Sequence, residues 1–232
     1  PLGGNEDLAT FMRGVRNQTP HLPRYSSIWD AECLLQHLEG LGNPENLDLK
    51  TLTLKLTALI LLASGHRVQT LPCLSIENLI FTGDGAKFTI LDKLKHTKTK
   101  GTEIFLKSYP ASPALCVVKH LSCYLQRTKP VRSSPTLLLS YQKPFQPIGT
   151  QTLGRWLRTL LQEAGIDLRV FAPHSIRAAS SAAAKRGGAQ VDTILRAGCW
   201  TKATTYSKWY EKPIRDQGPS FQTAILDHYN QQ

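Results

Sequence analysis

His174 and Arg177 are the two residues whose types and spacing point most directly to chemistry. Pro173 and His174 are typical of a helix start, and residues three apart on a helix share a face. An arginine offers a planar, two-pronged donor to a phosphate, and a histidine exchanges protons near neutral pH. The pair therefore suits phosphoryl transfer, although a His-x-x-Arg standing alone is more often a solvated helical arginine beside a capped histidine.

A second arginine, Arg67, follows the segment LTLKLTALILLASGHRVQTL. Its apolar residues recur at helical spacing after Asp48, which suits a helix N-cap, and stop at Ser64 and Gly65. The sequence therefore predicts a buried helix that holds Arg67 rigidly just beyond its end. A helix-terminal arginine that only caps carbonyl groups is the alternative.

A lysine-rich turn separates two predicted strands, Lys87 to Leu91 and Thr102 to Leu106, and closes at Gly101. This pattern predicts a β-hairpin. A lysine at the tip of such a hairpin can reach a phosphate of bound DNA. The lysines of this turn are Lys93, Lys95, Lys98 and Lys100.

The order of these sites, continuing to Trp200 and Tyr210, resembles the catalytic domain of the tyrosine recombinases, the phage-integrase family. Within that family the chain is most similar to the eukaryotic branch carried by DIRS-type retrotransposons and cryptons. The narrower resemblance rests on LPRYSSIWDAECLLQHL, LTLKLTALILLASGHRVQTL and CWTKATTYSKWYEKP, and the whole resemblance extends from about Phe11 to Pro213. It implies strand cleavage and rejoining of a mobile element's DNA, in the nucleus, by a synaptic tetramer.

The predicted chemistry needs neither a metal nor a cofactor. Arg67 and Arg177 would neutralise the charge that grows on the phosphate, and His174 would accept the proton of a tyrosine nucleophile. Lys95 would protonate the leaving 5′-hydroxyl, and Trp200 would donate its indole N–H to a phosphate oxygen. The product would be a covalent 3′-phosphotyrosyl intermediate. Lys98 is the alternative acid, and Trp200 could instead be an ordinary core aromatic.

Tyr210 is the preferred nucleophile because WYEKP matches the aromatic-Tyr-x-x-Pro ending of the eukaryotic branch. Tyr206 remains the alternative. Two departures from the family pattern affect this choice: Trp200 lies ten residues before Tyr210, where integrases commonly show nine, and Cys199 stands where many relatives have histidine.

Charge favours a polyanionic partner, because 28 Lys and Arg against 17 Asp and Glu give a formal net charge of +11. Neither a signal peptide nor an apolar run long enough to span a membrane is visible, so we expect double-stranded DNA as partner and no membrane. Besides the turn lysines Lys93, Lys98 and Lys100, we expect Arg155 and Arg158 to bind DNA, although a solvated polar face is an equal alternative for these two arginines.

Five scattered cysteines fit a reducing compartment. Cys116, His120 and Cys123 share one helical face, but a structural zinc site normally has four ligands, so we interpret the segment as a core stripe around Leu115, Cys116, Val118 and Leu121.

The expected fold class is α+β, mainly helical with a small antiparallel sheet of about three strands. Further helices are predicted around Asp7 to Arg16, from Trp29 to Leu38 and from Thr150 to Ala164. Residues 1–24 are expected to form an N-terminal helix and linker with a cloning remnant at 1–4, residues 25–213 the catalytic domain, and residues 214–232 a tail helix. The resemblance implies a catalytic fragment without its N-terminal core-binding domain, and a tail that packs either on its own core or into a neighbouring subunit.

Two other functions use parts of the same pattern. One is a domesticated DNA-binding module that descends from a recombinase and no longer cleaves. The other is a type IB topoisomerase, which nicks and reseals one strand by the same chemistry but needs no synapsis.

Overall fold

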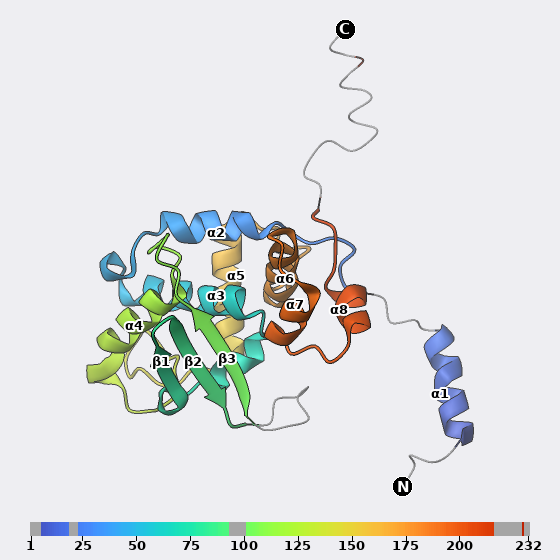
Figure 1. Ribbon diagram of the computed structural model, residues 1–232, viewed down its shortest axis with the longest axis horizontal. Coiled ribbons are helices and arrows are strands. Elements are labelled where there is room, and N and C mark those ends of the chain that lie inside the picture. Colours follow the sequence, from blue (N-terminus) through green and yellow to red (C-terminus); the bar gives the residue numbers. More distant parts are fainter. Residues whose placement is uncertain (1–5, 19–22, 93–100, 216–228, 230–232) are drawn as a thin grey trace.

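The computed structural model describes residues 6–18, 23–92, 101–215 and 229. In chain order the helices and strands are α1 (Glu6–Gln18), α2 (Ala31–Gly40), α3 (Leu49–Ser64), β1 (Leu79–Thr82), β2 (Gly85–Ile90), β3 (Thr102–Lys107), α4 (Val117–Thr128), α5 (Thr150–Glu163), α6 (Ile176–Arg186), α7 (Val191–Ala197) and α8 (Ala203–Trp209). Figure 1 shows the sheet and α4 on the left and α6, α7 and α8 grouped on the right, whereas α1 stands beside the body. The predicted mainly helical α+β fold is confirmed.

The central helix is α3, which contacts α4, α5, α6 and β3. Asp48 caps its start by accepting a hydrogen bond from the Thr51 N–H at 3.0 Å, and Gly65 ends it in the left-handed conformation with a φ of 61°. Most of the helix is buried, including Lys55, whose Nζ donates to the Gly42 carbonyl oxygen at 2.6 Å. Burial lowers the pKa of Lys55 to about 8. The sequence prediction for this helix is therefore confirmed at both ends.

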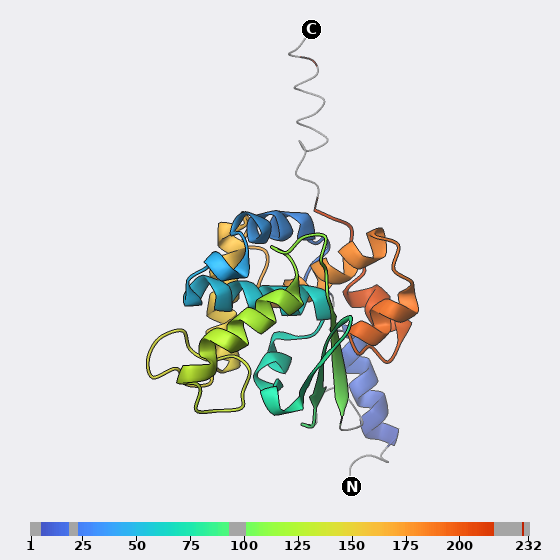
Figure 2. The same ribbon diagram turned by 60° about the vertical axis from the view of Figure 1, so that its left-hand side comes forward.

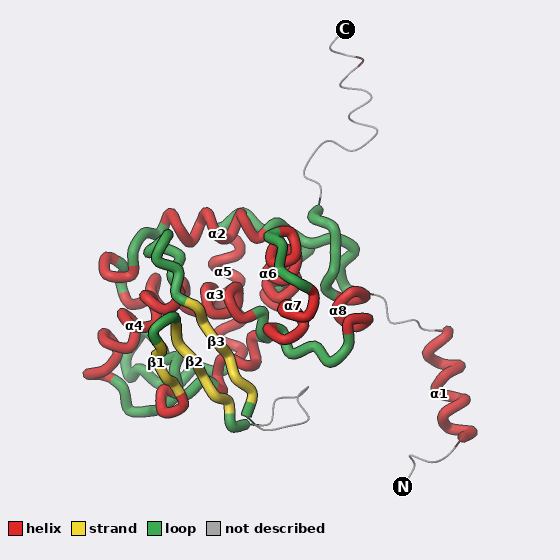
Figure 3. The backbone as a smooth tube through the Cα atoms, in the orientation of Figure 1, coloured by secondary structure: helices red, strands yellow, loops and turns green. Residues whose placement is uncertain are grey.

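The sheet has the order β1-β2-β3, and both pairs of strands are antiparallel. The last pair in the register of β2 with β3 is Ile90 with Thr102, so these strands form the predicted hairpin. The turn that carries the candidate lysines lies outside the described residues. The sequence did not predict the position of β1. Its side chains do not alternate between buried and exposed, and this alternation is the pattern by which a half-buried strand is recognised. Figure 3 shows the three strands side by side.

Three further predicted elements agree with the structure. The predicted helix around Asp7 to Arg16 is α1, the Trp29 to Leu38 pattern is α2, and the Thr150 to Ala164 pattern is α5, with Gly165 at a φ of 78° just beyond it. Figure 2 shows α2 covering one end of the body. Among the described residues, none of the helices is long and apolar enough to cross a membrane.

The helix α4 carries Cys123 and His120 and begins just after Cys116. The His120 Nδ1 bonds the Cys116 carbonyl oxygen at 2.9 Å, the Cys116 thiol accepts the Tyr109 N–H at 3.3 Å, and the Cys123 thiol donates to the Pro44 carbonyl oxygen at 3.5 Å. These three side chains thus contact protein groups in different directions, and Cys116 and Leu121 are buried as the core stripe predicts.

Candidate functional site

Arg67 takes its place from the end of α3. Gly65 turns the chain in the left-handed conformation, His66 is buried, and Arg67 is the residue before the 3₁₀ helix Val68–Cys73. The Thr70 N–H donates to the Arg67 carbonyl oxygen at 2.9 Å, which fixes the backbone of this turn. Arg67 is therefore held on a rigid support with a half-buried side chain, as the sequence predicts.

Arg177 lies in the first turn of α6, and its side chain is only 3% exposed. Its Nη1 donates to the Gly65 carbonyl oxygen at 2.5 Å and its Nη2 to the Gly198 carbonyl oxygen at 2.6 Å. One guanidinium thus joins the turn after α3 to the turn after α7. Its Nε is buried and, among the described residues, has no hydrogen-bond partner.

Two aromatic rings cover the Arg177 guanidinium. Its Cζ lies 3.8 Å from the ring centroid of Trp200 and 5.1 Å from that of Tyr210, and the two rings meet edge to face with centroids 4.8 Å apart. Such contacts are stabilised by cation–π attraction, which is stronger where water is excluded from the guanidinium. Trp200 is 8% exposed, and its indole N–H is buried without a partner among the described residues. Its predicted donation to a phosphate oxygen stays a prediction.

A pocket of about 200 Å³ is lined by Arg67, His174, Arg177 and Tyr210. Its other lining residues are Leu61, His66, Val68, Gln69, Pro173 and Ile176. Arg67 and Tyr210 therefore face one small cavity, although they are 143 positions apart in the sequence. The arrangement brings two guanidinium groups, an imidazole and a phenol within reach of one anionic group.

The charges at this pocket are set mainly by burial. Burial, followed by repulsion from Arg67, lowers the pKa of Arg177 to about 10, so the guanidinium remains charged at neutral pH. Burial lowers the pKa of His174, with a smaller contribution from Arg24, and His174 is therefore neutral at pH 7. Burial and the two arginines lower the pKa of His66 to about 4. The pocket is thus positive without a compensating carboxylate among its lining residues.

Tyr206 occupies a different environment from Tyr210. Its side chain is 1% exposed and packs against Trp200 with ring centroids 5.3 Å apart. Its hydroxyl is buried without a described partner, burial raises its pKa, and it lines a separate pocket with Lys185 and Glu211. Of the two candidate nucleophiles, only Tyr210 lies beside Arg67 and Arg177.

Two of the predicted DNA-binding residues are not brought to this pocket. Arg155 and Arg158 are exposed on α5, where Arg155 Nη2 donates to Thr152 Oγ1 at 3.3 Å. The candidate turn lysines lie outside the described residues, namely Lys93, Lys95, Lys98 and Lys100.

The structure adds contacts that the sequence did not suggest. The hydroxyl of Tyr25 lies 3.2 Å from His174 Nε2, and the Trp29 indole N–H donates to Ser175 Oγ at 2.7 Å. These residues are nearly 150 positions apart, so no local spacing could have indicated the contact. His66 also lines the pocket, but it was not predicted as a site residue, although it directly precedes Arg67.

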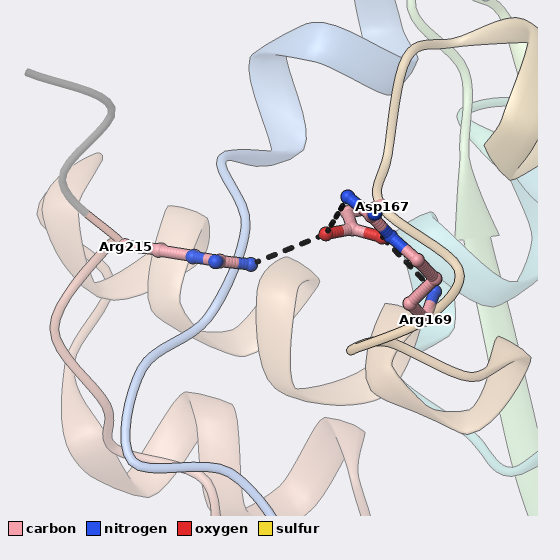
Figure 4. A network of polar contacts seen from close by, with 3 residues as sticks. All are labelled: Asp167, Arg169 and Arg215. Atoms are coloured by element: carbon pink, nitrogen blue, oxygen red, sulfur yellow. Dashed lines mark hydrogen bonds and ion pairs between the residues drawn. The ribbon is translucent and has the colours of Figure 1, made fainter.

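The backbone after Tyr210 is hydrogen-bonded to the segment before α2, which also carries Tyr25 and Trp29. Ile28 pairs with Ile214: the Ile28 N–H donates to the Pro213 carbonyl oxygen at 2.8 Å and the Arg215 N–H to the Ile28 carbonyl oxygen at 2.6 Å. The Arg215 side chain reaches Asp167, with Nη1 3.7 Å from Oδ2, and Asp167 also pairs with Arg169 (Figure 4). The backbone that follows Tyr210 is therefore fixed to the segment before α2.

The chain is similar to known proteins in sequence and in fold. A model of the phage integrase family matches residues 30–214. Similar solved structures include XerA recombinase, at 17% identity over 91% of this chain with a TM-score of 0.60. XerH site-specific recombinase in a post-cleavage complex with palindromic difH substrate shows 15% identity over 88% with a TM-score of 0.61. A lambda integrase (75–356) dimer bound to a COC′ core site shows 16% identity over 84% with a TM-score of 0.53.

These three likenesses establish the fold. The matched parts amount to 64%, 52% and 61% of those chains, so this chain spans less than two thirds of each relative's length. No curated protein sequence matches the chain significantly.

Proposed function

Because the chain belongs to the phage integrase family, we propose that it is a tyrosine recombinase that cleaves and rejoins DNA strands through Tyr210. The observation that carries this proposal is the pocket shared by Arg67, His174, Arg177 and Tyr210. A phenol beside two cations suits attack on a phosphodiester, because the cations stabilise both a phenolate and the negative charge of the transition state.

In the proposed reaction, Tyr210 Oη forms a bond to phosphorus while the bond from phosphorus to the 5′ oxygen breaks. The phenol proton passes to a base or to water, and the 5′ oxygen takes a proton from a general acid, for which Lys95 is the candidate and Lys98 the alternative. The resulting phosphotyrosyl ester keeps the energy of the broken bond. A second 5′-hydroxyl can then displace Tyr210 and reseal a strand without ATP, metal or cofactor.

Arg67 and Arg177 have distinct parts in this proposal. Arg177 uses two of its N–H groups on the Gly65 and Gly198 carbonyl oxygens, which leaves its Nε without a protein partner among the described residues. Arg67 has no carboxylate partner among the described side chains and lines the same pocket. Both guanidinium groups thus place positive charge beside the same pocket, where the half-buried Arg67 can contact a phosphate directly.

We further propose the eukaryotic DIRS-type and crypton branch, a mobile-element origin, a nuclear location and a synaptic homotetramer on double-stranded DNA. The resemblance of LPRYSSIWDAECLLQHL and CWTKATTYSKWYEKP to that branch supports the first three. The DNA complexes of XerH and of dimeric lambda integrase, together with a formal net charge of +11, support DNA as partner and assembly on it.

A test of the proposed function uses supercoiled plasmid and a pair of differently labelled duplexes, with EDTA present and ATP absent. We expect relaxed plasmid and, with duplexes that carry the target sequence, labelled products of strand exchange. Relaxation of the plasmid, together with no strand exchange between the duplexes at any of the protein concentrations tested, would instead indicate the topoisomerase. DNA binding with neither activity would indicate the non-catalytic module.

A further inference from the structure

The aromatic side chain that covers His174 comes from the segment before α2. Tyr25 stacks on the imidazole with ring centroids 5.5 Å apart and an interplanar angle of 26°, and its ring also contacts Phe171, with centroids 5.4 Å apart. Its hydroxyl lies 3.2 Å from His174 Nε2. The ring orientation of His174 is therefore set by a residue that precedes the part of the chain matched by the family model, which begins at residue 30.

A second contact favours one direction for this hydrogen bond. The Ala172 N–H donates to the Tyr25 hydroxyl oxygen at 3.1 Å, so one acceptor position of that oxygen is already engaged. The hydroxyl hydrogen is free to be donated, and His174 Nε2 is the acceptor beside it. A histidine that accepts at Nε2 carries its own proton on Nδ1.

The segment around Tyr25 is held firmly enough to fix this geometry. Trp29 is 4% exposed and donates to Ser175 Oγ, next to His174, and Ile28 pairs with Ile214 beyond Tyr210. Tyr25 thus contacts the imidazole from a backbone that is fastened both to the turn carrying His174 and to the chain after the nucleophile.

We propose that Tyr25 is a positioning residue that holds His174 as the Nδ1–H tautomer, so that His174 meets the scissile phosphate as a hydrogen-bond donor. This inference rests on the proposed function. Under it, Nε2 is occupied and His174 does not remove the proton of Tyr210. Water then takes that proton, and the positive field of Arg67 and Arg177 favours the phenolate.

Nitrogen-15 NMR of the histidine side chains of the 232-residue chain tests the tautomer without any DNA. The His174 signals are assigned by their loss in His174→Gln. We expect wild-type His174 at pH 7.5 with Nδ1 protonated and Nε2 unprotonated, and Tyr25→Phe with a shift toward the Nε2–H form. A protonated Nε2 in the neutral wild-type ring, or the same tautomer in both proteins, would overturn the inference.

The second measurement is the cleavage rate on DNA, with Tyr141→Phe as the matched control, because Tyr141 packs against Trp156 away from the pocket. Tyr25→Phe keeps the stacked ring and loses both hydrogen bonds of the hydroxyl, the one with His174 Nε2 and the one from the Ala172 N–H, so we expect cleavage to slow about tenfold while Tyr141→Phe cleaves normally. Unchanged cleavage in Tyr25→Phe would contradict the positioning role. If no protein cleaves DNA, the proposed function fails, and the NMR result still decides the tautomer.

Discussion

Gly198 and Trp200 lie so close together that a Cβ atom on Gly198 would overlap the indole ring. The same glycine supplies the carbonyl oxygen that accepts from Arg177 Nη2, and the same ring covers the Arg177 guanidinium. The absence of a side chain at position 198 therefore lets Trp200 close over the arginine.

Gly198→Ala is expected to displace Trp200 and to lower both activity and stability. Overpacking of this kind costs about 1–3 kcal/mol of unfolding free energy. Gly154→Ala is the matched control, since Gly154 lies within α5 with open space around its Cα, and we expect it to stabilise the protein by about 0.5–1 kcal/mol. Urea unfolding and DNA cleavage measure both effects. A Gly198→Ala protein as stable and active as wild type would refute this packing relationship.

The pocket is expected to bind inorganic anions through Arg67. Sulfate at about ten times its Kd should raise the unfolding free energy by about 1.4 kcal/mol relative to chloride at equal ionic strength, which corresponds to a Tm increase of about 2–4 °C per kcal/mol. Arg67→Ala should lose this difference in a thermal melt. Arg155→Ala, which removes an exposed arginine outside the pocket, should retain it. Equal sulfate effects in all three proteins would place the anion elsewhere.

The buried His120 is expected to make the fold sensitive to mild acid. Burial lowers its pKa from 6.5 to about 4. Between these values the unfolded chain binds a proton that the folded chain does not, so the unfolding free energy falls as the pH drops from 6.5 toward 4. One such histidine contributes on the order of 3 kcal/mol across this range.

Urea unfolding of wild type and His120→Asn at several pH values between 4.5 and 7.5 measures this effect. Asparagine can keep a donor near the Cys116 carbonyl oxygen but does not titrate. We expect a shallower pH dependence in the variant, whatever its stability at pH 7.5. Parallel pH profiles of the two proteins would show that His120 does not titrate as described.

Lys95 is expected to protonate the leaving 5′ oxygen. Lys95→Ala should slow cleavage about 10²–10⁴-fold, the usual contribution of general acid catalysis. A substrate in which sulfur replaces that bridging oxygen leaves as a thiolate and needs no proton, so it should restore cleavage. Lys98→Ala is the matched variant from the same turn. Loss and rescue in Lys98→Ala instead would transfer the role to Lys98.

The sequence predicts those parts of the fold and site that depend on local patterns. The Asp48 cap and the Gly65 stop define α3 and thereby the position of Arg67, and two strand-like segments on either side of a lysine-rich turn that closes at Gly101 define the β2–β3 hairpin. Long-range contacts leave no such pattern. The Tyr25–His174 contact and the covering of Arg177 by Trp200 depend on how distant segments pack, and they became visible only in the structure.

The choice of Tyr210 over Tyr206 shows the same limit. Both tyrosines lie in one short segment, and their surroundings differ only after the helices pack: Tyr206 is buried against Trp200, and Tyr210 faces the arginines. Spacing alone did not identify the nucleophile, because Tyr210 lies ten residues after Trp200 and Tyr206 only six, whereas integrases commonly show nine.

Covalent capture of DNA tests the central claim most directly. Wild type, Tyr210→Phe and Tyr206→Phe are each incubated with a pool of nicked duplexes of randomised sequence, denatured, and assayed for DNA that stays attached to protein, with the attachment site mapped by mass spectrometry. We predict attached DNA in wild type and Tyr206→Phe, joined through Tyr210, and none in Tyr210→Phe. Attachment that persists in Tyr210→Phe, or DNA binding without attachment in all three proteins, would contradict a recombinase that acts through Tyr210.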